Sequence, residues 1–203
     1  MESLKRLNEV LGRRFPGEQT TILAAVLATA SKKGRISYEE IDCGDDIKRN
    51  LLLLAYRERL LLPVKTSDAS ISLAWQDRIL TAKPGEIYEM PNVIRHLINH
   101  AKETGEWNPE LAVEKYLEEI AEPDADEMLT VFKEIRREIK SQTAPHATVK
   151  ITPHLMKQAA EKHKLKVNMN KLIVEFKGGG IINPHVDNPS KEGITYEVNL
   201  SLL

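Results

Sequence analysis

Apolar residues recur every three or four positions over most of this chain, which is the spacing of one face of an α-helix. Near the start, Leu4, Leu7 and Leu11 predict a short helix. An alanine-rich apolar stretch predicts a second helix over residues 18–30, and a further stripe predicts a third over residues 47–61. The first third of the chain is therefore expected to begin with helices.

Shorter signals separate these helices, and the period changes after the third one. Residues 35–37 predict a short extended segment, and Ser37 with Glu40 has the spacing of a capping box that opens a short helix. Pro63 is expected to end the third helix, because proline lacks the N–H group that a continuing helix needs. Alternating apolar residues then predict strands with a turn over residues 65–69. These alternating residues are Val64, Ile71, Leu73 and Trp75.

Residues 84–140 are expected to be wholly helical. Pro91 stands at a favourable first helical position, and Gly105 ends the apolar stripe that follows it. Pro109 opens the next helix. A further helix has the clearest amphipathic spacing, with steps of four, three and four residues between its apolar positions. These positions are Met128, Phe132, Ile135 and Ile139.

The last third of the chain is expected to repeat the order of the first. Thr152 predicts the start of a helix, since threonine before proline favours a helix N-terminus. A second helix is expected over residues 168–177, and the three glycines after it favour helix termination. Short strands are expected at residues 181–182 and 194–200, on either side of a loop.

The order of these expected elements resembles the winged helix-turn-helix superfamily. It runs helix, short strand, helix, turn, helix, strand, wing and strand, and it is expected twice. The resemblance implies a mainly α protein with short β-hairpins, built from two winged-helix-like lobes joined by a helical segment. The lobes would comprise residues 1–83 and 126–203, with an acidic helical linker over residues 84–125. The resemblance rests on element order and identifies no specific family within the superfamily.

The resemblance also implies a nucleic-acid-binding function. The recognition helices would be residues 46–61 and 168–177, with wings at residues 65–69 and 183–193. Winged helices that bind DNA place the exposed face of this helix in the major groove, where base edges are distinguishable. The working function is therefore double-stranded DNA binding in a transcription-regulatory role. The candidate contact residues are Lys48, Arg49, Asn50 and Arg57 in the first lobe and Lys164, Lys166, Asn170, Lys171 and Lys177 in the second.

The chemistry of these side chains suits such contacts. Arginine and asparagine make paired hydrogen bonds with guanine and adenine edges, and lysines beside the helix favour phosphates. A homodimer is also considered, because the recognition helices of dimers read two half-sites of one duplex.

The charge distribution keeps a second function open. The formal net charge is −1 and the pI is about 6.6, far below the value above 9 that is typical of a basic nucleic-acid-binding domain. Residues 1–83 hold 14 basic and 11 acidic side chains, residues 84–140 hold 7 and 14, and residues 141–203 hold 8 and 5. Two mildly basic lobes thus flank an acidic middle. The alternative function is a protein-interaction scaffold built on tandem winged helices, without nucleic-acid binding.

Few residue patterns indicate catalysis or metal binding. The single cysteine, Cys43, excludes a multi-cysteine metal site. His185 and Asp187 have the spacing of a ligand pair, but the sequence supplies no full set of ligands. Residues 178–180 are three glycines without the Gly-Lys-Ser/Thr of a phosphate loop. No catalytic residue, cofactor or metal is therefore expected.

The apolar runs are short. None approaches the roughly 20 residues that a membrane-spanning helix needs, and residues 1–14 carry no apolar signal-peptide core. A single cysteine also fits a reducing compartment. We therefore expect a cytoplasmic protein without a membrane partner.

Overall fold

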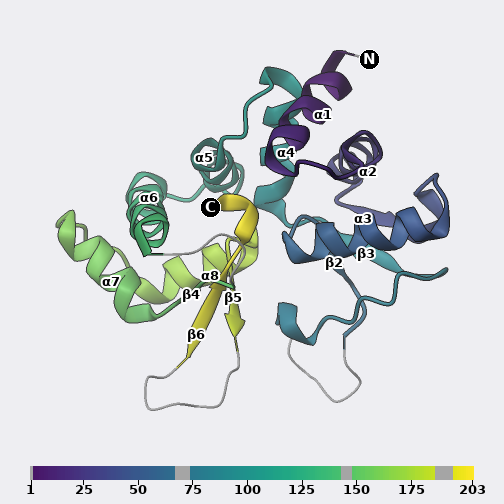
Figure 1. Ribbon diagram of the computed structural model, residues 1–203. Coiled ribbons are helices and arrows are strands. Elements are labelled where there is room, and N and C mark those ends of the chain that lie inside the picture. Colours follow the sequence, from purple (N-terminus) through teal and green to yellow (C-terminus); the bar gives the residue numbers. More distant parts are fainter. Residues whose placement is uncertain (1, 67–73, 143–147, 186–193) are drawn as a thin grey trace. The chain divides into compact units, whose positions relative to one another are not determined.

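The protein has two compact units in its computed structural model, which describes residues 2–66, 74–142, 148–185 and 194–203 (Figure 1). The first unit comprises Met1–Leu73 and Asp77–Asn108, and the second comprises Ala74–Gln76 and Pro109–Leu203. Within the described residues there are eight α-helices and two three-stranded antiparallel sheets. The expected mainly α fold with small β elements is confirmed.

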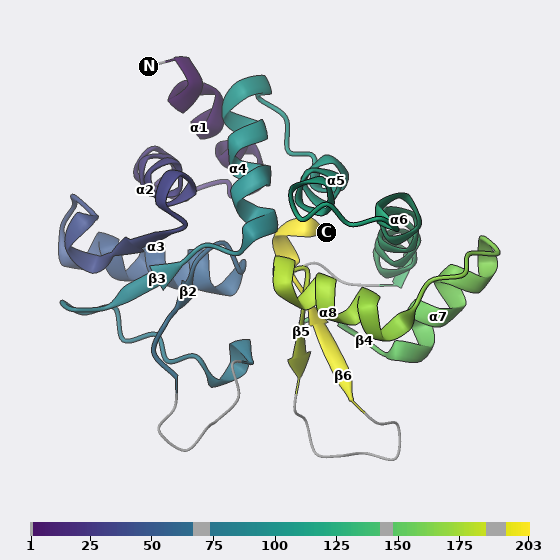
Figure 2. The same cartoon turned by 180° about the vertical axis from the view of Figure 1, so that it is seen from behind.

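Three helices form the core of the first unit. They are α1 (Glu2–Arg14), α2 (Thr20–Lys33) and α4 (Asn92–Thr104), and they gather together in both side views (Figures 1 and 2). Each buries one apolar stripe, and Leu11 and Leu27 have no exposed surface. Burial of such side chains stabilises a fold by about 1.5–3 kcal/mol each. The apolar stripes of these three helices therefore pack against one another.

The sheet of the first unit is built around its last strand. Its strands are β1 (Arg35–Ser37), β2 (Leu62–Pro63) and β3 (Ile87–Glu89), in the order β1-β3-β2. Ile36 of β1 and Pro63 of β2 both pair with Tyr88, which is 1% exposed. Because β3 lies inside residues 84–140, the expectation that this segment is wholly helical is wrong.

The segment between β1 and β2 agrees with the sequence-based prediction at its start and differs from it at its end. The expected capping box of Ser37 and Glu40 is present and opens the 3₁₀ helix η1 (Tyr38–Glu40). The next helix, α3 (Asp45–Arg57), ends six residues before Pro63, and Arg59 takes a positive φ of 56°. Pro63 therefore does not end this helix, because the chain has already turned into β2.

The strand expected around Trp75 is a 3₁₀ helix, η2 (Trp75–Asp77). The Trp75 N–H donates to a side-chain oxygen, Asn183 Oδ1, at 2.8 Å and not to the backbone carbonyl of a neighbouring strand. Most of the expected wing at residues 65–69, together with Ile71 and Leu73, lies outside the described residues.

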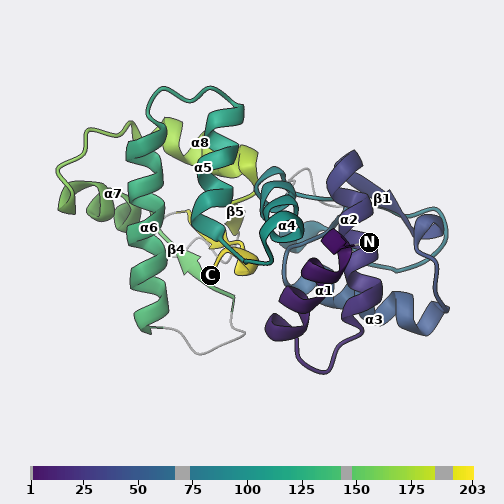
Figure 3. The same ribbon diagram turned by 90° about the horizontal axis from the view of Figure 1, so that it is seen from above.

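Four helices form the second unit: α5 (Pro109–Glu119), α6 (Ala125–Gln142), α7 (Pro153–Lys162) and α8 (Met169–Gly179). In the view from above, α5 and α6 lie side by side (Figure 3). The rings of Phe132 and Phe176 meet edge to face, with centroids 6.5 Å apart. This contact packs α6 against α8.

The predicted helix starts of this unit are confirmed. Thr152 Oγ1 accepts a hydrogen bond from the Leu155 N–H at 3.2 Å. The Asn168 side chain likewise accepts from the N–H groups of Asn170 and Lys171. These bonds satisfy backbone donors that have no partner inside the helix.

The second sheet repeats the topology of the first. Its strands are β4 (Lys150–Ile151), β5 (Ile182–His185) and β6 (Thr195–Val198), in the order β4-β6-β5. The predicted final strand stops at Val198, because Asn199 caps the 3₁₀ helix η3 (Leu200–Leu202). Each unit thus contains helix, strand, helix, helix, strand and strand, with the last strand in the middle of the sheet. The first of these helices is α2 in one unit and α6 in the other.

The two units divide between Asn108 and Pro109. The segment of residues 84–125, expected as a separate linker, contributes α4 to the first unit and α5 to the second. The physical reason is burial: Leu97 of α4 and Leu117 of α5 are both fully buried. A helix with a covered apolar face is part of a core.

Two of the three consecutive glycines have distinct structural roles. Gly180 has a φ of 73° and ends α8 in the left-handed conformation. Gly179 lies inside the helix against the ring of Tyr116, whose hydroxyl donates to the Glu175 carbonyl at 3.0 Å. A Cβ at Gly179 would come within 2.5 Å of Tyr116 Cε1. The absent side chain at residue 179 therefore lets α5 approach α8.

Replacement of Gly179 by alanine should lower the free energy of unfolding by about 1–3 kcal/mol, because overpacking forces the Tyr116 ring to shift. Gly12→Ala is the matched control. Gly12 is also helical, but its Cβ would lie 3.9 Å from the nearest atom, so the better helix propensity of alanine should leave stability equal or higher. Denaturant unfolding measures both, and equal effects of the two substitutions would contradict the close-approach argument.

Candidate functional site

The exposed face of α3 carries three of the four residues expected to bind nucleic acid in the first unit. Arg49, Asn50 and Arg57 are exposed and share one face of the helix. The centre of this face is apolar, because Leu53 is 57% exposed. Lys48 does not belong to it: its Nζ lies 4.5 Å from the centroid of the Tyr38 ring and 3.4 Å from the Tyr38 carbonyl oxygen.

Carboxylates offset the positive charges of this face. Arg49 Nη1 lies 4.0 Å from Asp46 Oδ1, and Arg57 Nε donates to Glu58 Oε1 at 3.2 Å. Asp45 and Asp46 both occupy the first turn of α3, and the side chain of Asp46 is 98% exposed. The helix therefore presents an apolar centre, two arginines and an acidic end.

The exposed face of α8 differs in charge. Asn170, Val174 and Lys177 are exposed and stand three or four residues apart, with Val174 61% exposed at the centre. Acidic side chains are absent from the exposed residues of α8, all of which the structure describes. Lys171 is the exception among the expected residues, because its ammonium pairs with Glu122 and lies 3.1 Å from Asp124 Oδ2.

Lys164 and Lys166 lie in the turn that precedes α8. Both side chains are exposed, and the backbone of Lys164 has a positive φ of 56°. The turn is short because the N–H groups of Lys164 and Leu165 bond back to the end of α7. Four of the five residues expected in the second unit are therefore solvent-accessible on α8 or directly before it.

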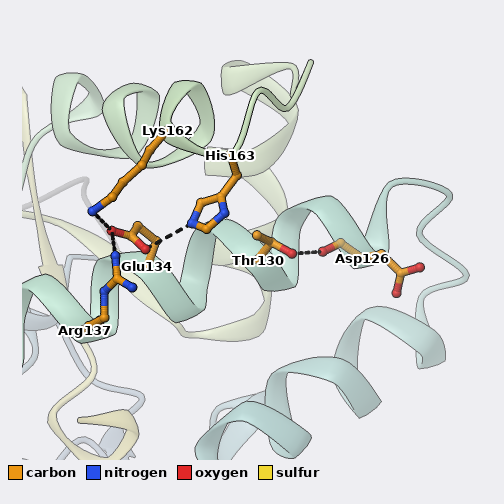
Figure 4. A network of polar contacts seen from close by, with 6 residues as sticks. All are labelled: Asp126, Thr130, Glu134, Arg137, Lys162 and His163. Carbon is orange, nitrogen blue, oxygen red and sulfur yellow. Dashed lines mark hydrogen bonds and ion pairs between the residues drawn. The ribbon is translucent and has the colours of Figure 1, made fainter.

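A buried carboxylate that the sequence analysis did not single out joins α6 to α7. Glu134 is 3% exposed, and Figure 4 shows it between Arg137 of its own helix and the side chains of Lys162 and His163. Arg137 Nη2 lies 2.5 Å from Glu134 Oε1, Lys162 Nζ lies 2.6 Å from the same oxygen, and His163 Nε2 lies 3.0 Å from Oε2. One carboxylate thus has three nitrogen partners.

These partners stabilise the ionised form of Glu134. The hydrogen bond from Lys162, followed by those from His163 and Arg137, lowers the pKa of Glu134 to about 2, although burial opposes this shift. The carboxylate is therefore charged at neutral pH, and it ties the end of α7 to the middle of α6.

A pocket of about 430 Å³ opens beside this network. Four cationic side chains of α6 line it, spaced three, one and three residues apart along the helix. They are Lys133, Arg136, Arg137 and Lys140, and the lining also includes Thr130, Glu110, Glu134 and His163. These cations do not stand out in the charge total of residues 84–140, because twelve acidic residues precede them there. Their spacing of three, one and three residues, which places them along one helix, was the signal by which they could have been recognised.

The residues considered for metal binding or catalysis can be placed in part. Within the described residues no group of three or more His, Cys, Asp or Glu side chains could hold a metal ion. His185 Nδ1 lies 3.8 Å from Glu197 Oε2, and Asp187 is outside the described residues. Burial raises the pKa of the Cys43 thiol, which opposes a reactive thiolate.

One further finding concerns the helices as a group. None of the helices in the described residues is long and apolar enough to cross a membrane.

Replacement of Glu134 by glutamine should lower the free energy of unfolding by about 3 kcal/mol at neutral pH, because it leaves a cluster of cations without its carboxylate. The pKa of Glu134 in the folded protein lies below the ordinary glutamate value of 4.5, so this contribution is complete above about pH 4.5 and is lost as pH falls toward 2. The difference between wild type and variant should therefore shrink over that window.

Denaturant unfolding at pH 7 and pH 3 measures this difference. Glu118→Gln is the control, since Glu118 pairs with Lys115 on the exposed surface of α5 and should contribute less than about 1 kcal/mol. A difference between wild type and Glu134→Gln that stays constant with pH would show that the charge of Glu134 is not what stabilises the junction.

The sequence and structure of the chain were compared with those of known proteins and protein families. Neither the curated proteins nor the solved structures gave a match. A family model does match, and it covers residues 5–203. Because this match spans nearly all of both units, the chain belongs to that family, which is one of unknown function.

Proposed function

We propose that this protein binds double-stranded nucleic acid, DNA in a regulatory role, and that the second unit makes the main contact. The observation that carries the proposal is the exposed face of α8, which holds Asn170 and Lys177 and follows a turn with Lys164 and Lys166. Acidic side chains are absent from that face. The fully exposed positions of this helix therefore carry less negative charge than those of α3, and its one acidic residue, Glu175, is half-buried.

The topology supports the same proposal. The element order of each unit is consistent with a winged helix-turn-helix, and in each the last strand pairs with the other two. In such domains the third helix enters the major groove. In this chain that helix is α3 or α8. The proposal thus assigns α8 to the groove. Of the wing expected at residues 183–193, the first three residues belong to β5, and residues 186–193 lie outside the described residues.

The contacts divide into two kinds. Asn170, near the start of α8, suits paired hydrogen bonds with an adenine edge, and Val174 suits apolar contact with a thymine methyl group. Lys164, Lys166 and Lys177 stand beside these residues as point charges for phosphates. Lys171 takes no part, because Glu122 and Asp124 hold its ammonium.

The first unit supports a second candidate function. The exposed face of α3 has Leu53 at its centre, with Arg49, Arg57 and Asp46 around it. An apolar centre with a rim of mixed charge is typical of protein-protein contacts. The alternative proposal is a protein-interaction scaffold in which α3 contacts a protein and neither unit binds nucleic acid.

Simultaneous replacement of Lys164, Lys166 and Lys177 by glutamate should weaken binding of a mixed-sequence duplex at least tenfold. It should also lower the slope of log Kd against log salt concentration by about 2–3, since each lost phosphate contact removes about 0.9 from that slope. Fluorescence anisotropy of the full chain at two or more salt concentrations measures both quantities.

Two further variants make this experiment selective. Lys115→Glu changes an exposed lysine of α5 that pairs with Glu118, and it should leave duplex affinity within twofold of wild type. Charge reversal of Arg49 and Arg57 together tests α3, and the proposal expects a smaller loss than that of the α8 variant. If wild type shows no saturable binding even at low salt, the nucleic-acid function is excluded and the scaffold function remains.

A further inference from the structure

Two buried carboxylates of this protein are satisfied in different ways. Glu86 accepts hydrogen bonds from neutral donors only: Thr81, the Ala82 N–H at 2.8 Å and the Tyr88 hydroxyl at 2.5 Å. Glu134 instead lies against Arg137, Lys162 and His163. Neutral donors hold Glu86, whereas the partners of Glu134 bring positive charge to the surface beside it.

The cations around Glu134 exceed the charge they neutralise. Arg137 and Lys162 carry two positive charges against the single negative charge of Glu134. In the lining of the adjoining pocket, four cationic side chains stand beside two carboxylates, those of Glu110 and Glu134. Such an excess inside a concave surface raises the local concentration of anions.

The lining also has the right chemistry for an oxyanion. Arg137 holds Glu134 through Nη2, and its side chain is 63% exposed. Lys133 is 49% exposed, and its nearest carboxylate oxygen, Glu110 Oε2, is 4.0 Å away. Lys140 is exposed one helical turn from Arg137. Arg136 is different in kind, because Glu110 and the carbonyls of Leu202 and Leu203 hold it in place.

We propose that the pocket between α6 and the end of α7 binds a phosphate group. A phosphate monoester carries about −1.5 to −2 charges at pH 7, and cationic side chains outnumber carboxylates in the lining. Its oxygens accept the bidentate hydrogen bonds that arginine offers and the point charges of lysine. Glu134 is the positioning residue of this site, because it holds Arg137 and His163, which line the pocket with it.

The phosphate can come from either of two sources with the same chemistry. One is the backbone of a nucleic acid, and the other is a free phosphorylated small molecule. The site does not depend on the α8 face described above, because Lys133 and Lys140 are on α6.

Inorganic pyrophosphate is the probe, and isothermal titration calorimetry of the full chain at constant ionic strength is the measurement. The test variant replaces Lys133 and Lys140 by glutamine, which removes two charges from the pocket and leaves Arg137 and Glu134 as a pair. Lys157→Gln is the matched control, since Lys157 is an exposed lysine of α7 that pairs with Glu161 and does not line the pocket. Circular dichroism and thermal unfolding confirm that each variant is folded.

Wild type and Lys157→Gln should bind pyrophosphate with equal affinity, and the double variant should bind it at least tenfold more weakly. Anisotropy with a duplex separates the two sources. If a backbone phosphate occupies the pocket, the double variant also loses duplex affinity and the salt slope falls by about 1–2. If a small molecule occupies it, duplex affinity is unchanged. The proposal is overturned if the double variant binds both pyrophosphate and duplex as wild type does.

The outcome is separable from that of the proposed function. The Lys164, Lys166 and Lys177 variant should reduce duplex affinity and leave pyrophosphate binding intact, since none of these lysines lines the pocket. Pyrophosphate binding without any duplex binding would therefore retain the pocket and exclude nucleic acid as the ligand.

Discussion

The constraint on which each unit depends is the pairing of its last strand with both earlier strands. β3 and β6 form the middle of sheets whose strands are only two to four residues long. Backbone hydrogen bonds of a middle strand are satisfied on both sides, so these short sheets close only when the last strand arrives. The second strand of each unit, β2 or β5, must therefore lie beside the last strand, β3 or β6. This requirement sets the direction of α3 and α8, the helices that precede β2 and β5.

The two units share this frame and differ in the chemistry of the exposed helix face. In α3 the acidic first turn and the apolar Leu53 limit contact with phosphates. In α8 carboxylates are absent from the fully exposed positions, Glu175 is half-buried, and Glu122 and Asp124 pair with Lys171. The charges of α6 and α7 add to this asymmetry, because Glu134 organises an excess of cations that the first unit does not reproduce at Glu86.

Local signals in the sequence predicted the structure best. The caps at Thr152 and Asn168 and the end of α4 at Gly105 follow from hydrogen bonds within four residues, so the sequence determines them directly. The strand β3 was missed because its three residues gain their structure from β1 and β2 far along the chain. Lys171 and Glu134 show the same limit for the site. Their partners lie 47 and 28 residues away, at Asp124 and Lys162, and no local pattern relates them.

The central claim is that the second unit contacts the duplex through α8. Backbone amide chemical shifts of the uniformly ¹⁵N-labelled full chain, followed during titration with a mixed-sequence duplex at low salt, test it most directly. The account predicts that the largest shift changes fall in residues 164–177 and that residues 46–57 of α3 change little. Changes confined to α3, or no changes at saturating duplex, would contradict it.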